Sequence, residues 1–561
     1  METYLLVQSL YSKALTALAV LAIGVLVLLP SFYLFTFIVL RWSEVYTEIF
    51  NHPLIGNTYL LYITRYLFFS FKLALTALIV DLLLGIPVAY ILVKKNFPGK
   101  GILENLVLLP LVIPTSGFGF ATLIAWTAIE SLPVLLGIRI RVDTLVPVVN
   151  IPALMLIVHV TLTFPYIVKT VSAALRDLEK GYEIVSESLG ASPLTTFRKV
   201  IFPLILPGIF SGSVLAFARS LGETGATMVV AGVTTTASIA IVKWELEGKL
   251  APAAFLGALL VAAALAVILP VEYFLGRKKR VRGVGVPKEL ELKVVSAERK
   301  FLSKLSFVKD AVSLLFLFIV VVMPIISLVV FTVKYWSADP YTGRPEGGIL
   351  YQLYGPPNYS SLITRSLTTS LIVATTSTLI SLYLAVVTIM VIEKTRLGRV
   401  LRALLKIPLV VPTSALGLSM VLLWGPLGLS ILRPSIWLTI LTHIVFSVPV
   451  IVETGLASYE ELEVELYEET ARTLGANPYD VLETVSIPMI KRGLVAGGLL
   501  AFTHSLGETG ATFLVMGDHI TISTLVVNLV EALAIPTALF ASTLLILFSL
   551  VLLTLASLVS K

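Results

Sequence analysis

The sequence predicts an all-α membrane protein with about 12 transmembrane helices, arranged as two tandem, parallel six-helix repeats. Two observations carry this prediction. Of the 561 residues, 57% are hydrophobic and only 13% are charged, which is more apolar surface than a water-soluble fold of this length could bury. Long stretches of the chain also occur twice with the same motifs, which indicates an internal duplication.

The duplication is clearest in residues 159–232 and 443–517. Both segments begin with a histidine, contain a shared Ser-Leu-Gly-Glu-Thr-Gly-Ala-Thr string near their ends, and finish with a glycine. Matching positions are 284 residues apart at the start and 285 apart later, because the second copy has one extra residue. A shorter motif, Pro-Leu-Val-Ile/Val-Pro-Thr-Ser, occurs at residues 110–116 and 408–414. The two halves therefore have the same plan, with loops of different lengths.

Each half contains six apolar runs long enough to cross the roughly 30 Å hydrocarbon core of a bilayer. The fifth run of each half is interrupted by Gly and Pro. In the third runs, we expect helix kinks at Pro110, Pro114, Pro408 and Pro412. The predicted spans are residues 14–40, 67–93, 104–129, 150–175, 204–229 and 251–275, then 311–335, 366–392, 403–425, 435–457, 489–515 and 536–560.

The charge pattern orients these spans. We divide the chain into a first repeat (1–275), a basic linker (276–310) and a second repeat (311–561). The linker holds 11 Lys or Arg and 4 Asp or Glu, an excess of 7 that equals the net charge of the whole protein. Basic connections lie on the cytoplasmic side, so six spans per repeat place both termini there, in a multi-pass protein of the cell membrane. The basic residues flank helix ends without interleaved aromatics, which argues against nucleic-acid binding.

A polar segment separates the fourth and fifth spans of each repeat. Residues 176–200 and 459–485 are too charged to cross lipid. Each is predicted to form a helix, a turn at Gly190 or Gly475, and a second helix, because glycine readily takes the left-handed conformation that ends a helix. From physics alone, a solvated link between spans and a docking surface are equally compatible with this pattern.

The second of these hairpins resembles the cytoplasmic "EAA" signature of binding-protein-dependent ABC importer permeases. It reads Glu469-Thr-Ala471, then Gly475, then Val-Ser-Ile-Pro488. The first copy matches at Gly190 and Pro203, but its acidic residue, Glu183, is displaced by one position. The resemblance implies a type I ABC importer-like fold in which these hairpins dock on a cytoplasmic ATPase. The residues that would carry this coupling are Glu183, Gly190, Pro203, Glu469, Ala471, Gly475 and Pro488.

The same resemblance implies partners. They are two copies of an ABC ATPase subunit and an extracytoplasmic substrate-binding protein, and this single chain would supply both halves of the pore. Neither Gly-Lys pair of the sequence has the upstream glycine and following Ser or Thr of a phosphate-binding loop. We therefore expect no ATPase, no enzymatic activity and no cofactor in this chain, with ATP used by the partner.

Ionisable residues occur inside the fifth span of each repeat. Such residues are costly in a membrane and point to a polar path or a paired charge. Arg219 and Glu223, like His504 and Glu508, are four residues apart, so each pair could lie on one helix face and neutralise itself. The two interpretations stay open and are compatible. The candidate residues of the translocation path or gate are Arg219, Glu223, Thr224, His504, Glu508 and Thr509.

No metal site is expected. The chain has no cysteine, and His159 and His443 lack the surrounding carboxylates or thiolates of a metal centre. Hydrogen bonding within the helix bundle is the simpler prediction for both histidines.

The substrate is predicted from a second resemblance. The Leu-Gly-Glu-Thr-Gly-Ala-Thr string is similar to a segment of molybdate, tungstate and sulfate permeases, with Thr224 and Thr509 in place of phenylalanine. The fused two-repeat arrangement looks more like ferric-iron and thiamine permeases. We expect an oxyanion substrate, with ferric iron or thiamine as the alternative. A gradient-driven secondary transporter is a further alternative, because duplicated helices with intramembrane carboxylates also suit that class.

Overall fold

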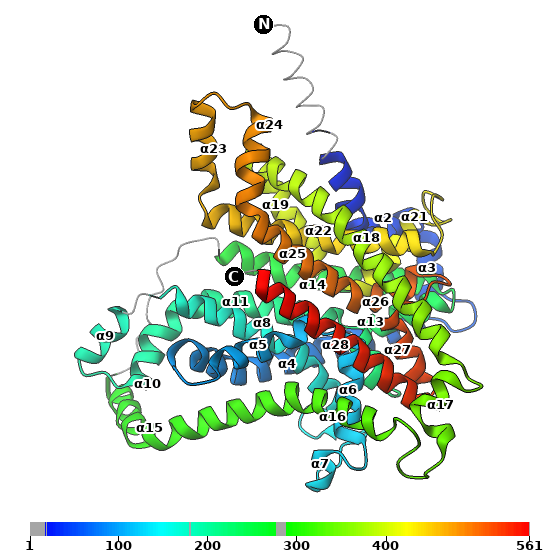
Figure 1. Cartoon of the computed structure of the whole chain (residues 1–561), viewed down its shortest axis with the longest axis horizontal. Helices are drawn as coiled ribbons and strands as arrows, with labels where there is room; N and C mark the ends of the chain where they lie inside the picture. Colours follow the sequence, from blue (N-terminus) through cyan, green and yellow to red (C-terminus); the bar gives the residue numbers. More distant parts are fainter. Residues whose placement is uncertain (1–16, 18–19, 179–180, 276–287, 396, 560–561) are drawn as a thin grey trace, which may run out of the picture.

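The computed structural model describes residues 17, 20–178, 181–275, 288–395 and 397–559, and they form an almost entirely helical bundle (Figure 1). The strands in this part of the chain are β1 (Leu145–Val146) and β2 (Ile151–Pro152), which form a short antiparallel hairpin. Among the described residues, 11 helices are long and apolar enough to cross a membrane, or 12 if one bent pair counts as a single span. The predicted all-α, multi-spanning fold is confirmed.

The first half begins in a span whose start, residues 14–16, 18 and 19, lies outside the described residues. Its elements are η1 (Gly24–Leu28), α2 (Leu29–Leu40), α3 (Trp42–Phe50), α4 (Thr58–Lys94), α5 (Lys100–Val112), α6 (Thr115–Thr127), α7 (Leu132–Leu135), α8 (Ala153–Arg176), α9 (Gly181–Ser188), α10 (Pro193–Thr196), η2 (Phe197–Ile201), α11 (Phe202–Gly222), α12 (Gly225–Val230), α13 (Ala237–Leu246) and α14 (Leu250–Leu275).

The second half has a similar order and begins with a helix that starts within the predicted linker. Its elements are α15 (Lys288–Leu317), η3 (Phe318–Val322), α16 (Met323–Lys334), η4 (Pro345–Gly347), α17 (Ile349–Tyr354), α18 (Tyr359–Lys394), α19 (Gly398–Leu405), α20 (Ile407–Val410), α21 (Thr413–Trp424), α22 (Ile436–Glu461), α23 (Val464–Thr473), α24 (Pro478–Val481), η5 (Leu482–Ser486), α25 (Ile487–Gly507), α26 (Gly510–Val515), α27 (Ile522–Glu531) and α28 (Ile535–Val559).

Both third spans, predicted over 104–129 and 403–425 with proline kinks, are broken into separate helices. The breaks lie at Pro114 and Pro412, where kinks were expected. Proline cannot donate a backbone hydrogen bond and forces the preceding residue into an extended conformation. Ile113 and Val411 accordingly have ψ angles of 134° and 126°. In the second repeat the two pieces of the span are bent by 105°.

Both fifth spans, predicted over 204–229 and 489–515 as runs interrupted by Gly and Pro, are also broken. In the first repeat α11 ends at Gly222 and α12 begins at Gly225. In the second repeat α25 ends at Gly507 and α26 begins at Gly510. The short helices α12 and α26 are each followed by another short helix, α13 or α27, that was not predicted.

The linker is partly helical. Residues 276–287 lie outside the described residues, but α15 begins at Lys288 and runs without interruption toward the seventh span, Val308–Lys334. The end of the predicted linker and the start of the second repeat are therefore one continuous helix.

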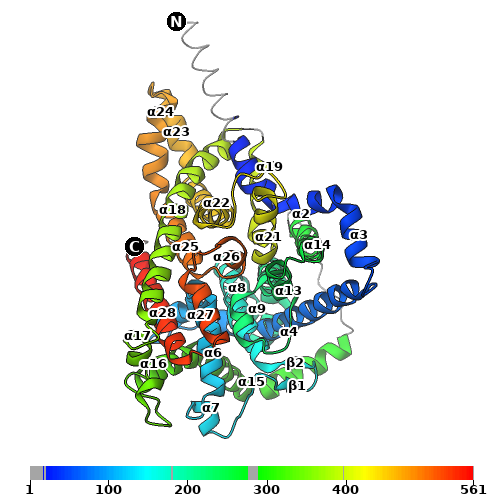
Figure 2. The same ribbon diagram turned by 90° about the vertical axis from the view of Figure 1, so that its right-hand side faces the viewer.

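The two repeats interlock. The first span of each repeat packs on the third span of the other, since α2 contacts α21 and α16 contacts α6 (Figure 2). In the first of these contacts the Ser419 hydroxyl donates to the Pro30 carbonyl. The Thr161 hydroxyl also lies 3.3 Å from the Val320 carbonyl, which joins α8 to the start of the second half. The broken third and fifth spans are thereby enclosed at the centre of the bundle.

Candidate functional site: the central breaks, the cavity and the polar hairpins

The four helix breaks meet at the centre of the bundle. A Cβ atom added to Gly222 would lie 3.0 Å from the Cα atom of Pro412, and one added to Gly507 would lie 2.8 Å from the Cα atom of Pro114. The fifth-span break of each repeat therefore touches the third-span break of the other. At this distance from a neighbouring backbone, a glycine is the residue that fits without displacement.

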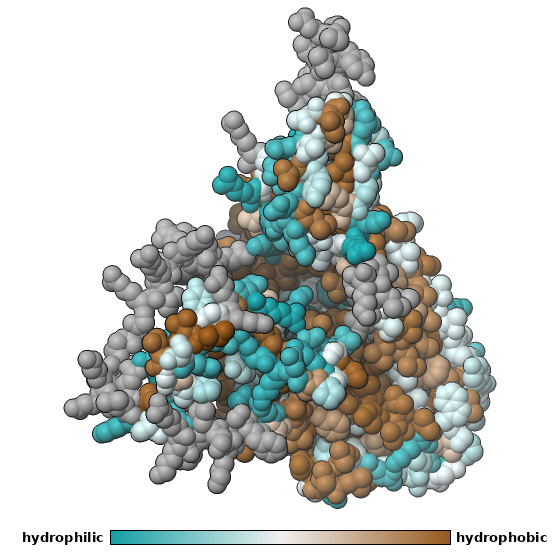
Figure 3. Space-filling model, turned by 60° about the vertical axis from the view of Figure 1, so that its left-hand side comes forward, coloured by the Kyte–Doolittle hydropathy of each residue, from teal (hydrophilic) through white to brown (hydrophobic). Residues whose placement is uncertain are grey.

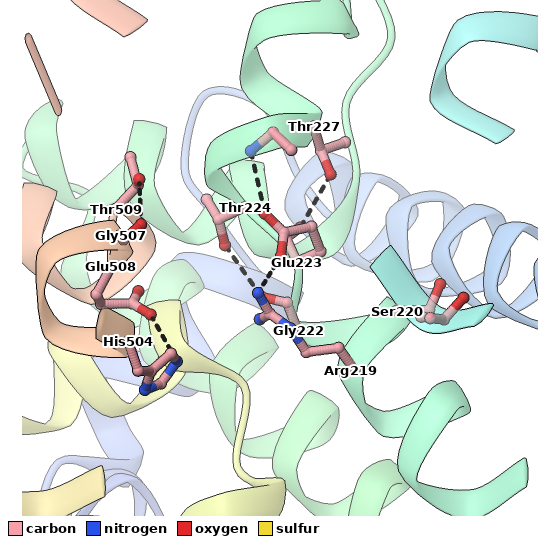
Figure 4. Close-up of polar contacts among 12 residues, drawn as sticks. Arg219, Ser220, Gly222, Glu223, Thr224, Thr227, His504, Gly507, Glu508 and Thr509 are labelled. Carbon is pink, nitrogen blue, oxygen red and sulfur yellow. Dashed lines mark hydrogen bonds and ion pairs between the residues drawn. The ribbon is translucent and has the colours of Figure 1, made fainter. Parts of the chain in front are cut away.

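A second pair of reciprocal contacts crosses between the repeats. A Cβ atom on Gly225 would lie 2.6 Å from the Thr509 Cβ atom, and one on Gly510 would lie 2.8 Å from the Thr224 Cβ atom. The structure thus places both predicted path threonines where the two halves meet, related by an approximate twofold arrangement. Figure 4 shows the two segments facing each other.

The predicted charge pairs are formed across the breaks. Glu223 Oε2 lies 2.7 Å from Arg219, while its Oε1 accepts a hydrogen bond of 3.0 Å from the Ala226 backbone N–H. Glu508 repeats this pattern, at 3.6 Å from His504 and 3.1 Å from the Ala511 N–H (Figure 4). Glu223 therefore pairs with a guanidinium and Glu508 lies beside an imidazole, and each glutamate caps the short helix after the break, where a carboxylate is favoured.

His159 and His443 hold the breaks in place. His159 Nδ1 lies 2.7 Å from the Ser220 hydroxyl and Nε2 lies 3.0 Å from the Thr227 hydroxyl. Thr227 also donates to the Glu223 carbonyl, which leaves its oxygen to accept from the Nε2–H of a neutral histidine. His443 makes the equivalent contacts in the second repeat, at 2.6 and 3.0 Å. The prediction of hydrogen-bonded histidines is confirmed.

A cavity of about 300 Å³ ends at these breaks. Its walls on α11 and α25 come from residues that precede the breaks, so it lies on the side from which the polar hairpins project. Figure 3 shows the molecule hollowed between two lobes, with hydrophilic residues around the hollow. The polar or charged residues of the wall include Tyr166, Lys169, Arg219, His504 and Glu508.

Two of these wall residues were missed by sequence reasoning. Tyr166 and Lys169 lie on α8, within a span that had been treated as a simple apolar run. A lysine inside a membrane helix is the signal that could have identified the site.

The predicted polar hairpins are confirmed as structures. Gly190 and Gly475 take positive φ angles of 85° and 93° at the turns between α9 and α10 and between α23 and α24. Both hairpins project from the body of the protein (Figure 1). Pro203 and Pro488 stand in the first turns of α11 and α25, where the absence of an N–H donor is tolerated. Ala471 is half-buried in α23.

Exposed apolar side chains mark matching positions on the two hairpins. Leu189 and Leu474 are each 83% exposed, and Tyr182 and Tyr467 are 51% and 54% exposed. These pairs are 285 residues apart, so the duplication has kept both positions. Large apolar side chains exposed on projecting polar hairpins are typical of a protein–protein contact.

One acidic residue forms ion pairs that hold each hairpin against the bundle. In the first hairpin it is the predicted residue, but in the second it is the neighbour of the predicted one. Glu183 pairs with Lys94, and the residue at the matching position is Glu468, which pairs with Lys394 at 4.0 Å. Glu468 is 2% exposed and also binds Arg472 and the Ser486 hydroxyl, whereas the predicted Glu469 is exposed. Glu468 was not predicted because the EAA motif begins at its neighbour, Glu469.

We predict different effects for these two adjacent glutamates. Glu468→Gln should weaken the second hairpin by about 1–3 kcal/mol, because it weakens charge-assisted contacts to Arg472 and Lys394. Glu469→Gln is the matched control and should change stability by less than about 0.5 kcal/mol. Hydrogen exchange of residues 464–486 in the full chain measures both effects. Equal exchange in the two variants would contradict the structural role of Glu468.

The first hairpin has an additional support from the linker helix. Glu298 of α15 accepts hydrogen bonds from Arg198 at 2.8 Å and from the Thr195 hydroxyl at 2.5 Å. Burial raises the pKa of this carboxyl, but the two hydrogen bonds and the charge of Arg198 outweigh it and hold the pKa below its ordinary value. This contact joins the linker to the first hairpin in the ionised state, and it is lost as the pH falls through the lowered pKa.

Comparison with known proteins identifies the class. The chain belongs to the family described as binding-protein-dependent transport system inner membrane component, whose model matches residues 81–280 and again residues 377–561. It is thus a fused, two-repeat ABC permease. Over 209 residues it is 37% identical to the molybdenum transport system permease protein ModB of Mycobacterium tuberculosis, a match that covers 36% of this chain and 76% of ModB.

Sulfate permeases are also similar. The chain is 33% identical over 164 residues to the probable sulfate transport system permease protein cysT of Marchantia polymorpha, which covers 29% of this chain and 55% of that protein. It is 31% identical over 250 residues to the protein of the same name from Chlorella vulgaris, covering 43% and 87% respectively.

Proposed function

We propose that this chain forms the complete transmembrane pore of an ATP-driven importer. An extracytoplasmic binding protein would deliver the solute, and two ATPase subunits would each bind one polar hairpin. The observation that carries this proposal is the pair of projecting hairpins with matching exposed residues, Leu189 with Leu474 and Tyr182 with Tyr467. In this role the chain is a permease and not an enzyme, and its partner uses the ATP.

The proposed orientation follows from the hairpins and the basic linker, which would both lie in the cytoplasm together with the two termini. Gly225 contacts Thr509 and Gly510 contacts Thr224 where the two halves meet, and we call this pair of contacts the central crossing. In the proposed orientation the cavity is on the cytoplasmic side of the central crossing. This arrangement suits an inward-facing state, closed toward the outside. ATP-driven approach of the hairpins would separate the central breaks and open the path outward.

We propose an oxyanion of the molybdate, tungstate or sulfate class as the substrate. The names of the similar permeases support this choice, as do the basic residues Lys169 and Arg219 on the cavity wall. Ferric iron or thiamine remains the alternative, suggested by the fused arrangement.

The test is isolation of the tagged chain from native membranes together with its bound proteins, followed by uptake assays in proteoliposomes with ATP inside. We expect an ATPase at two copies per chain and ATP-dependent uptake of labelled molybdate or sulfate. Uptake driven by an ion gradient without ATP would instead favour a secondary transporter.

A further inference from the structure

We propose that the cavity holds an oxyanion-binding station on one side only, formed by Tyr166, Lys169 and Arg219 of the first repeat. This inference rests on the proposed import of an oxyanion and adds where in the pore the anion is held. It predicts that the two repeats, although related by duplication, contribute unequally to the path.

The duplication itself supplies the comparison. The residues that match Tyr166, Lys169 and Arg219 in the second repeat are Val450, Glu453 and His504. The first repeat thus presents a phenol, an ammonium and a guanidinium, all hydrogen-bond donors suited to an oxyanion. The second repeat presents an apolar side chain, a carboxylate and an imidazole at the same positions.

A set of inverted charges explains why Lys169 is available. Glu104 of the first repeat pairs with Arg176 at 3.0 Å. In the second repeat the matching residues have the opposite charges, Arg402 in place of Glu104 and Glu460 in place of Arg176, and they also form a pair. Arg402 pairs in addition with Glu453, at 3.4 Å. Arg402 therefore engages the residue that corresponds to Lys169. In the part of the chain that the structure describes, Lys169 itself forms no ion pair and lines the cavity.

The other charges on the cavity wall favour the same side. Arg219 is paired with Glu223, which leaves part of the guanidinium, whose side chain is 21% exposed, facing the cavity. Glu508 faces the cavity from the second repeat and repels an anion there. On α8, His159 lies beside Ser220 at the break, whereas Thr170, next to Lys169, lies beside Gly212, seven residues before Arg219. An anion leaving the central crossing would therefore meet Arg219 first and Lys169 next.

The space is sufficient. A cavity of about 300 Å³ is far larger than the roughly 30 Å³ that one water occupies in the liquid. A tetrahedral oxyanion can therefore enter with part of its hydration shell, which lowers the cost of leaving water. A partly hydrated anion held by Lys169 and by the exposed part of the Arg219 guanidinium can bind and still be released.

The experiment measures ATP-dependent uptake of labelled sulfate and molybdate by the full complex in proteoliposomes, together with ATP hydrolysis. The variants are Lys169→Gln, Lys169→Arg as the conservative variant, and Glu453→Gln as the matched control in the second repeat. We expect Lys169→Gln to lower uptake at least about tenfold, the effect of losing one charge-assisted contact. Hydrolysis should continue, Lys169→Arg should restore uptake, and Glu453→Gln should stay within about twofold of the original chain.

The outcomes separate the two proposals. If the unaltered complex takes up neither oxyanion, the proposed substrate class is wrong and the station with it. If it takes up an oxyanion and Lys169→Gln does so equally well, the station is wrong while the proposed function stands. Equal losses in Lys169→Gln and Glu453→Gln would overturn the one-sided arrangement.

Discussion

Replacing both Leu189 and Leu474 with aspartate is expected to abolish ATP-driven uptake while the chain still inserts into the membrane. Each leucine is 83% exposed at the tip of a hairpin, so neither contributes to the core of the permease. Full burial of a leucine in a protein contact contributes about 1.5–3 kcal/mol. Because each ATPase subunit would bind one hairpin and lose one leucine contact, each should bind at least about tenfold more weakly.

Copurification of the ATPase with the tagged variant measures this effect, and uptake in proteoliposomes measures its consequence. Val233→Asp is the matched control, because Val233 is 99% exposed but lies outside both hairpins, just after α12. The control should retain both ATPase and uptake. Normal copurification of the double variant would mean that the hairpins are not the docking surface.

A bulky residue at Gly225 or Gly510 should have the second large effect, on transport rather than on assembly. A Cβ atom at either position would approach the opposite threonine Cβ atom to within 2.6 or 2.8 Å, so the two halves must move apart. Overpacking of this kind costs about 1–3 kcal/mol. We expect Gly225→Val and Gly510→Val to lower uptake at least about tenfold, with the ATPase still bound and hydrolysing ATP.

Gly101→Val is a suitable control, because a Cβ atom on Gly101 meets no other atom within 4 Å. Its uptake should stay close to that of the original chain. If Gly225→Val and Gly510→Val also transported normally, the central crossing would not be part of the gate. If they lost the ATPase, the defect would lie in folding, and thermal unfolding of the purified chain would detect it.

The spans and hairpins could be predicted because their signals are local. Hydropathy over some 20 residues identifies a membrane helix, and a glycine before a helix-starting proline identifies a turn such as that at Gly190. The number of spans and the form of the hairpins follow from such patterns. The polar pairing of Arg219 with Glu223 was also predicted from spacing alone.

The positions of the breaks in the fifth spans could not be predicted in this way. Gly222 and Gly507 sit in strings that remain apolar enough to continue a helix, and hydropathy does not register a backbone turn. The end of α11 combines a local contact, in which Glu223 caps the next helix, with a tertiary one, in which the backbone of Pro412 lies against Gly222. The cavity residue Lys169 was missed for a similar reason, because its significance depends on Arg402 and Glu453 in the other repeat.

The packing of the first span of each repeat on the third span of the other has a consequence for biosynthesis. The inner face of α6 is almost completely buried, and α16 of the second repeat covers part of it. Ribosomes add about 5–20 residues per second, so α16 follows α6 by roughly 200 residues and about 10–40 seconds. During this interval the first repeat waits in the membrane with one side uncovered. Its final packing is therefore a late event in the synthesis of the chain.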